Sequence, residues 1–224
     1  MSALPQEIPS AELDAALQRL VRNKQKWAQT SIEARIQILA EIKDRLQEVA
    51  AEWAKTASSH KQIPQGSPLE GEEWMSGPYT VMAACNALMQ TLSQMTGKEF
   101  LGDLPTRPVS ENQLSVRVLP HSVWDHLLLS GIKADVWMQP EVTAANLQEF
   151  AATAYDVPVD ERQGSLSLVL GAGNIAAIAP LDCFQKLFGE HSVVLLKMNP
   201  VNDYLVEVLE KALKPLIDFG ALWI

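Results

Sequence analysis

The sequence lacks the features that mark several classes of protein. It has only two cysteines in 224 residues, which fits a reducing compartment better than a disulfide scaffold. No apolar run is long enough to cross a bilayer. The first ten residues contain neither the basic nor the apolar region of an export signal. These absences predict a cytoplasmic protein without a membrane span.

Positive charge is also scarce. Lys and Arg number 18 against 27 Asp and Glu, so the formal net charge is -9. Binding to nucleic acid or to an anionic membrane relies on dense Lys and Arg, so neither is expected as a partner. Hydrophobic residues, at 47%, are abundant enough for a packed core in one large domain or two small ones.

Two amphipathic helices are predicted near the N-terminus. Ser10 can cap the first, over about residues 11–28, and Thr30 with Glu33 fits a capping box at the start of the second. In the second helix, apolar residues recur at intervals of three and four, the pattern of one buried face. They are Ile32, Ile36, Leu39, Ile42, Leu46, Val49 and Trp53. The charged residues between them, Arg35 included, are assigned to the solvated face.

The middle of the chain predicts one more helix and a hairpin-like extension. The helix covers about residues 78–96, and Cys85 within it reads as a small buried hydrophobe. Residues 97–112 are predicted as a loop. Residues 113–119 and 132–138 alternate between apolar and polar side chains, which is typical of half-buried strands.

Two histidines between these strands are the best metal-ligating pair in the chain. His121 and His126 are five residues apart, which places them on one face of neither a helix nor a strand. A third ligand is missing from the pattern, so no metal site is predicted. A helix capped by Thr143 is expected to follow, over residues 143–155.

The last third of the chain alternates strand and helix. Residues 165–170 and 192–198 are apolar runs separated by a glycine turn and a helical pattern over residues 175–188. A further helix over about residues 203–218, interrupted near Pro215, leads to a short apolar run at the end of the chain. The prediction is an α/β fold: N-terminal helices, a β-hairpin-like extension and a partial Rossmann-like parallel βαβαβ unit. Its three regions are residues 1–112, 113–163 and 164–224.

The glycine turn is the strongest candidate site. Gly171 to Ala176 reads GAGNIA and satisfies G-x-G-x-x-G/A between a strand and a helix, the context of a dinucleotide fingerprint. The second strand ends in Lys197, Met198 and Asn199, where an acid usually binds the ribose. A cation there fits a ribose 2′-phosphate or a donor to ribose hydroxyls. The alternative is a turn of small residues that serves only helix–strand packing.

Three stretches resemble the cofactor half of the aldehyde dehydrogenase superfamily, nearest to a divergent branch related to acyl-CoA reductases. They are KWAQTSIEARIQILAEIKDRL, LVLGAGNIAAIAP and VVLLKMNPVNDYLVEVLEKAL. The resemblance implies NAD or NADP as cofactor, an aldehyde or acyl substrate and a homo-oligomer. It gives Asn174 the role of an oxyanion-stabilising amide and Lys197 that of a ribose ligand, with Gly171, Gly173 and Asn199 beside the cofactor. In this family the pyrophosphate does not lie in the first glycine turn.

The sequence also departs from that family. Ala172 and Gly173 replace its usual Pro-Trp, and Pro200 stands where an acid follows the lysine. By the resemblance, the family's Gly-rich loop, general-base Glu and catalytic Cys belong beyond residue 224, so the chain is expected to be a truncated enzyme. Neither Cys85 nor Cys183 has the sequence surroundings of an activated nucleophile.

Two functions follow from these observations. The first is the N-terminal fragment of an aldehyde dehydrogenase-like oxidoreductase, inactive alone. The second is a non-catalytic interaction or assembly module that associates through an unfinished sheet with exposed apolar surface. A small reductase of ordinary Rossmann type would need a Tyr or Ser spaced with a Lys as general acid, and no such set is found.

Overall fold

The computed structural model describes residues 10–102, 104–120 and 122–224. Contacts within the chain divide it into two compact units. The first comprises the described residues up to Ser93 and from Val157 on, and the second is Gln94–Asp156. The first contains a parallel sheet and the second an antiparallel one, so the predicted α/β class is confirmed. No helix in the described part of the chain combines the length and the apolar character needed to cross a bilayer.

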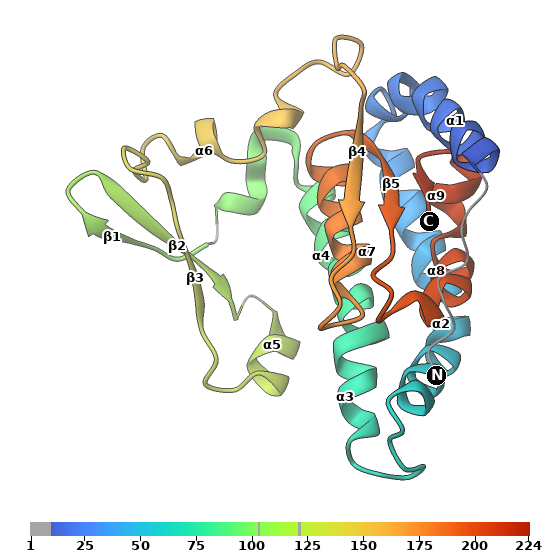
Figure 1. Cartoon of the computed structure of the whole chain (residues 1–224). Helices are drawn as coiled ribbons and strands as arrows, with labels where there is room; N and C mark the ends of the chain where they lie inside the picture. The colour runs from blue at the N-terminus through green and yellow to red at the C-terminus, as the bar shows by residue number, and fades with distance from the viewer. Residues whose placement is uncertain (1–9, 103, 121) are drawn as a thin grey trace. The chain divides into compact units, whose positions relative to one another are not determined.

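Three parallel strands form the sheet of the first unit. Strand β4 (Ser165–Leu170) pairs with β5 (Ser192–Lys197), which pairs with β6 (Leu222–Trp223). In Figure 1, β4 and β5 run side by side and point the same way. Their pairing is continuous from Ser165 opposite Ser192 to Leu170 opposite Lys197. This confirms the predicted βαβαβ pattern and brings the carboxyl ends of β4 and β5 to one edge.

Helices connect these strands. Between β4 and β5 run α7 (Ile178–Phe184) and a π-helical turn (Gln185–Gly189). Between β5 and β6 run a 3-10 turn (Asp203–Leu205), α8 (Val206–Ala212) and α9 (Lys214–Phe219). The helical pattern breaks ahead of Pro215, as expected, because a proline fits the first turn of a new helix better than a helix interior.

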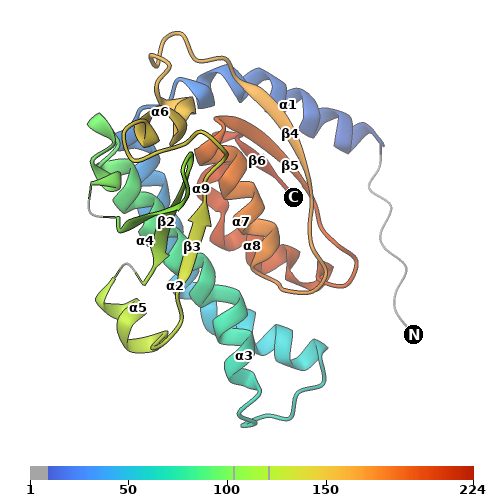
Figure 2. The same ribbon diagram turned by 90° about the vertical axis from the view of Figure 1, so that its left-hand side faces the viewer.

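Two long helices pack around the sheet and its connections. Helix α1 (Ser10–Ala28) contacts all three strands and lies across them in Figure 2. Helix α2 (Ile32–His60) packs against α8, α9 and α4 (Thr80–Ser93). Five residues of its predicted apolar stripe are buried, while Ile32 and Ile36 are only half-buried. The buried ones are Leu39, Ile42, Leu46, Val49 and Trp53. A short helix α3 (Glu70–Trp74) and a π-helical turn (Met75–Tyr79) lead into α4.

The start of α2 differs from the predicted capping box. Ser31, not Thr30, is the N-cap: its hydroxyl accepts from the N–H of Ala34 at 3.2 Å. The Thr30 hydroxyl instead donates to the carbonyl of Lys26 at 2.9 Å, because Thr30 still belongs to the last turn after α1. Hydrogen bonds from its own backbone N–H and from Ser31 lower the pKa of Glu33.

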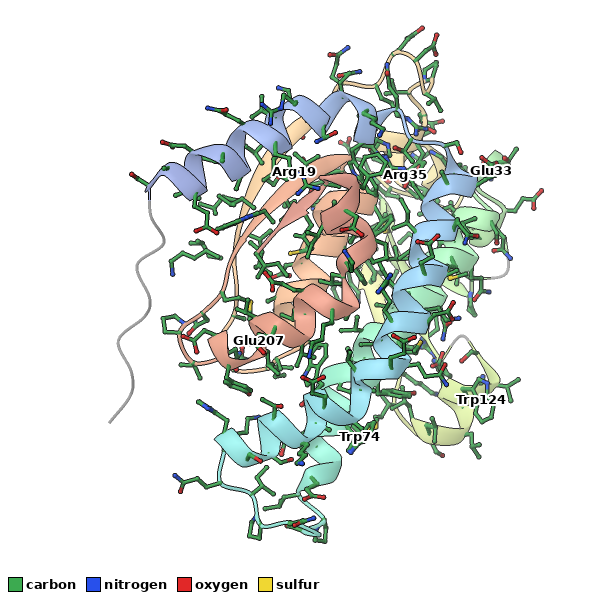
Figure 3. The ribbon with its side chains drawn as sticks, turned by 90° about the vertical axis from the view of Figure 1, so that its right-hand side faces the viewer. Arg19, Glu33, Arg35, Trp74, Trp124 and Glu207 are labelled. Atoms are coloured by element: carbon green, nitrogen blue, oxygen red, sulfur yellow. The ribbon has the colours of Figure 1, made fainter. Side chains whose placement is uncertain are left out.

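Arg35 is buried, although the sequence pattern assigned it to the solvated face. Its guanidinium donates to the carbonyls of Trp27 at 2.7 Å, Leu187 at 3.0 Å and Thr30 at 3.2 Å, and it lies 4.5 Å from the centre of the Trp27 ring. Carbonyls at helix ends lack partners within their own helix, and two such groups, those of Trp27 and Leu187, meet on this one cation. A second arginine, Arg19 on α1, caps α9 through the carbonyls of Ile217 and Asp218; both arginines are labelled in Figure 3.

The second unit is built on an antiparallel sheet in the order β1-β2-β3. Strands β2 (Gln113–Leu119) and β3 (Ala134–Trp137) confirm the predicted extension. Strand β1 (Thr106–Ser110) lies in the stretch predicted as a loop, because pairing with β2 overrides a weak local pattern that contains a proline. The core of this unit consists of Leu114, Val116, Val142 and Leu147.

Helices in the second unit are short. They are a 3-10 stretch (Thr96–Leu101), α5 (Val123–Leu128), α6 (Leu147–Phe150) and a 3-10 turn (Thr153–Tyr155). The single helix predicted over residues 143–155 is therefore wrong. The Asn146 side chain accepts the N–H of Thr143 in a local turn, and Ala152 takes a left-handed backbone, so the helical ladder cannot continue.

Candidate functional site

The candidate site lies at the edge where β4 and β5 end. Ligands of parallel sheets bind at the carboxyl ends of the strands, where the connecting loops begin. The N–H of Gly171, just after β4, donates to the carbonyl of Lys197 at the end of β5, at 2.9 Å. The structure therefore brings the glycine turn and the Lys197–Asn199 segment together, as the sequence pattern predicts.

The two glycines of the turn leave room for close backbone contacts. A Cβ on Gly171 would lie 3.2 Å from the Cβ of Ala179 and 3.3 Å from the carbonyl oxygen of Lys197. A Cβ on Gly173 would lie 3.0 Å from Nδ2 of Asn199. Gly171 thus serves packing between strand and helix, whereas Gly173 gives space to the side chain of a predicted cofactor residue.

Two asparagines after β5 hold the loops of this edge. Oδ1 of Asn199 accepts the N–H of Val201 at 3.0 Å, and Nδ2 of Asn202 donates to the carbonyl of Ala172 at 3.0 Å. Asn202 is buried. Its bond to the glycine turn spans thirty residues, so no local pattern could have indicated it.

The polar side chains predicted to meet a ligand are accessible. Asn174 and Lys197 are both exposed, and Asn199 is half-buried. Within the described chain, neither the Asn174 amide nor the Lys197 ammonium has a hydrogen-bonding or ionic partner. A free amide donor and a free cation at one edge suit an oxygen-rich, anionic ligand.

The helix start does not form the phosphate cradle that the glycine fingerprint suggests. Helix α7 begins at Ile178, three residues later than predicted, and residues 176–177 form a turn before it. The N–H of Ala177 donates to the carbonyl of Ser76 at 3.1 Å, and that of Ile178 to Ile175. These two backbone groups are therefore not free to bind a phosphate, and the edge offers its exposed side chains as donors.

Neither cysteine is chemically activated. Cys85 and Cys183 are buried, and burial raises the pKa of each thiol to about 12. A thiol attacks a carbonyl as the thiolate, which is scarce at neutral pH for such a pKa. No group of three or more His, Cys, Asp or Glu side chains within the described residues is arranged to hold a metal. His121 lies outside those residues, and His126 lies on α5.

Apolar surface adjoins the polar edge. Strand β4 pairs only with β5 among the described strands, so its other edge is open. Leu168 and Leu170 on β4 are 60% and 66% exposed. A parallel sheet is ordinarily covered on both of its faces, so apolar side chains on its strands are usually buried. This open strand is a surface on which a further strand or an apolar group could pack.

Comparison with known proteins leaves the family unassigned. No protein-family model matches the chain, and no curated protein matches it. The resemblance to aldehyde dehydrogenases therefore stays a prediction made from the sequence.

Proposed function

We propose that the chain supplies the NAD- or NADP-binding edge of a cytoplasmic aldehyde dehydrogenase-like oxidoreductase, a homo-oligomer that acts on an aldehyde or acyl substrate. The observation that carries the proposal is the meeting of the glycine turn with Lys197 and Asn199 through the Gly171–Lys197 hydrogen bond. Parallel sheets bind dinucleotides at this kind of edge. The exposed side chains of Asn174 and Lys197 supply polar contacts there, so the proposal does not need the N-terminus of a helix as a binding group.

Each side chain has a distinct role in the proposal. The Lys197 ammonium binds the adenosine ribose, and the Asn199 amide, packed on Gly173, lies beside it. The Asn174 amide donates to the oxyanion that develops when a nucleophile attacks the carbonyl carbon of the substrate. When bound, the cofactor accepts or supplies the hydride.

In this proposal, the chain by itself has no activated nucleophile. With a pKa of about 12, neither Cys85 nor Cys183 provides thiolate at the pH of the cell. The chain is therefore expected to bind nucleotide without oxidising aldehydes. NAD(P)H production from an aldehyde by the purified chain, abolished by Cys183→Ala, would contradict this assignment of roles.

The test of nucleotide binding is a titration followed by calorimetry. NADP⁺ or NAD⁺ should bind with a millimolar or lower Kd. Lys197→Ala should lower the affinity for whichever of the two nucleotides binds more tightly. The matched control is Lys186→Ala, which makes the same change in net charge on a residue paired with Glu190 away from the turn. If neither nucleotide binds the folded chain, the proposal fails.

A second function, a non-catalytic assembly module, is favoured by the open edge of β4. Its backbone groups on that side have no described strand partner, and Leu168 and Leu170 are exposed beside them. Size-exclusion chromatography separates the two functions. Large assemblies that dissociate in Leu168→Lys, from a chain that binds no nucleotide, support the assembly module. Nucleotide binding by the Leu168→Lys monomer supports the oxidoreductase.

A further inference from the structure

The end of β5 carries a positive charge that no nearby acid in the sequence offsets. Lys197 is exposed and has no ionic partner within the described chain. From His191 to Asn202 the sequence contains no Asp or Glu. The preceding acid, Glu190, is held by Lys186 at 2.7 Å in an ion pair.

This arrangement discriminates between two kinds of adenosine ribose. An acid after the second strand of a dinucleotide-binding unit accepts hydrogen bonds from free ribose hydroxyls, whereas a cation there accommodates a 2′-phosphate. The same acid would repel the phosphate, and it is missing here. We propose that this edge selects nucleotides with a phosphate on the 2′ oxygen of the adenosine ribose, the NADP class. This inference rests on the proposed function and specifies its ligand.

Asn199 supplies a second donor for that phosphate. Its Oδ1 already accepts the N–H of Val201, so the Nδ2 hydrogens are left, beside Gly173. Nδ2 donates no hydrogen bond within the described chain. A phosphate dianion accepts several hydrogen bonds, and those from a charged ammonium are about twice as strong as neutral ones. Lys197 therefore provides most of the discrimination, and Asn199 adds to it.

An apolar surface for the base adjoins the cation. Leu170 is the register partner of Lys197, and paired residues of neighbouring strands point to the same face of a sheet. Leu170 is 66% exposed, so its side chain is available to an adenine ring. A cation beside an exposed leucine fits a phosphate on the sugar next to a flat apolar base.

The experiment compares two probes that differ only in the 2′-phosphate: adenosine 2′,5′-bisphosphate and adenosine 5′-monophosphate. Calorimetry on the full chain should show the bisphosphate binding about tenfold more tightly, the effect of one charge-assisted contact. Adenosine 3′,5′-bisphosphate has the same charge in a different position and should bind as the monophosphate does. The preference should shrink as salt is added, because the contact is exposed.

Variants assign the discrimination to residues. Lys197→Ala should remove the tenfold preference by weakening the 2′,5′-bisphosphate more than the monophosphate, while the charge-matched Lys186→Ala should keep the preference. Leu170→Ser should weaken both probes by the same factor, since both carry adenine. Circular dichroism and a cooperative unfolding transition verify that each variant is folded.

The possible results separate this inference from the function on which it rests. Equal affinity for monophosphate and 2′,5′-bisphosphate overturns the inference and leaves the nucleotide-binding function standing. Equal affinity for the two bisphosphates, or a preference that survives Lys197→Ala, also overturns it. Binding of no adenosine nucleotide, nor of NAD⁺ or NADP⁺, by the folded chain overturns both.

Discussion

The side-chain amide of Asn202 donates a hydrogen bond to the backbone carbonyl of Ala172, at 3.0 Å. This bond joins the loop after β5 to the glycine turn after β4. Because Asn202 is buried, water cannot easily replace the lost donor if the side chain is shortened. The bond therefore contributes both to the stability of the fold and to the shape of the candidate site.

Asn202→Ala should lower the free energy of unfolding by about 1–2 kcal/mol, the usual effect of leaving a partly buried hydrogen-bonding group unpaired. It should also weaken nucleotide binding, because the turn loses its tie to the neighbouring loop. Urea unfolding and calorimetry measure the two effects. Asn23→Ala, which removes an exposed amide bonded within α1, is the control and should change neither. An unchanged stability of Asn202→Ala would show that water replaces the amide.

Arg35→Met should be among the most destabilising single changes in the chain. It leaves the carbonyls of Trp27 and Leu187 without this donor in a buried region and removes the cation from the Trp27 ring. The expected loss is about 3 kcal/mol, against less than about 0.5 kcal/mol for the exposed control Arg22→Met. Both are measured by chemical denaturation. A loss in Arg35→Met no larger than in the control would mean that these carbonyls find other partners.

Gly164→Ala tests the contact between α1 and the start of β4. A Cβ at Gly164 would overlap the backbone carbonyl of Lys24, which cannot rotate away as a side chain can. We expect a loss of stability of at least about 2 kcal/mol, typical of a forced backbone shift in a packed region. Gly71→Ala is the matched control: it lies in α3 with no atom within 4 Å of the added methyl group. There alanine should be neutral or stabilising by up to about 1 kcal/mol.

The two buried thiols predict a loss of stability at alkaline pH. Folding raises the pKa of Cys85 and Cys183 from 9.0 to about 12, so the folded state favours the protonated form. Their contribution is complete below pH 9 and is lost progressively as the pH rises from about 9 towards 12. The Cys85→Ala, Cys183→Ala double variant should therefore lose less stability than the native chain over that range.

Urea unfolding at several pH values measures this difference. Tyr204 and Lys211 also have raised pKa values, but they are common to both chains and cancel in the comparison. A thiol reagent offers a second measure: both cysteines should react slowly in the folded chain and fast in urea. Parallel pH profiles for the two chains would contradict the expectation.

Local sequence patterns predicted the elements of the parallel sheet. The boundaries of β4 match the predicted run, and β5 ends one residue earlier than expected. The apolar stripe of α2 identified most of its buried face. These patterns work because side chains two residues apart in a strand, or three and four apart in a helix, share one environment. The approach of Gly171 to Lys197 also followed, since parallel strands end at the same edge.

What the tertiary structure alone decided depends on residues far apart in the chain. Arg35 is buried because the carbonyl of Leu187 meets it, and Asn202 belongs to the site because Ala172 lies across the edge. Helix α7 begins later than predicted. The N–H of Ala177, just before the helix, donates to the carbonyl of Ser76, on a turn about a hundred residues earlier. No periodicity encodes such pairs, because a hydrogen bond between distant residues exists only once the chain has folded. The sequence by itself therefore determined which segments form the sheet edge, and only the folded chain decided which of its polar groups are left to meet a ligand.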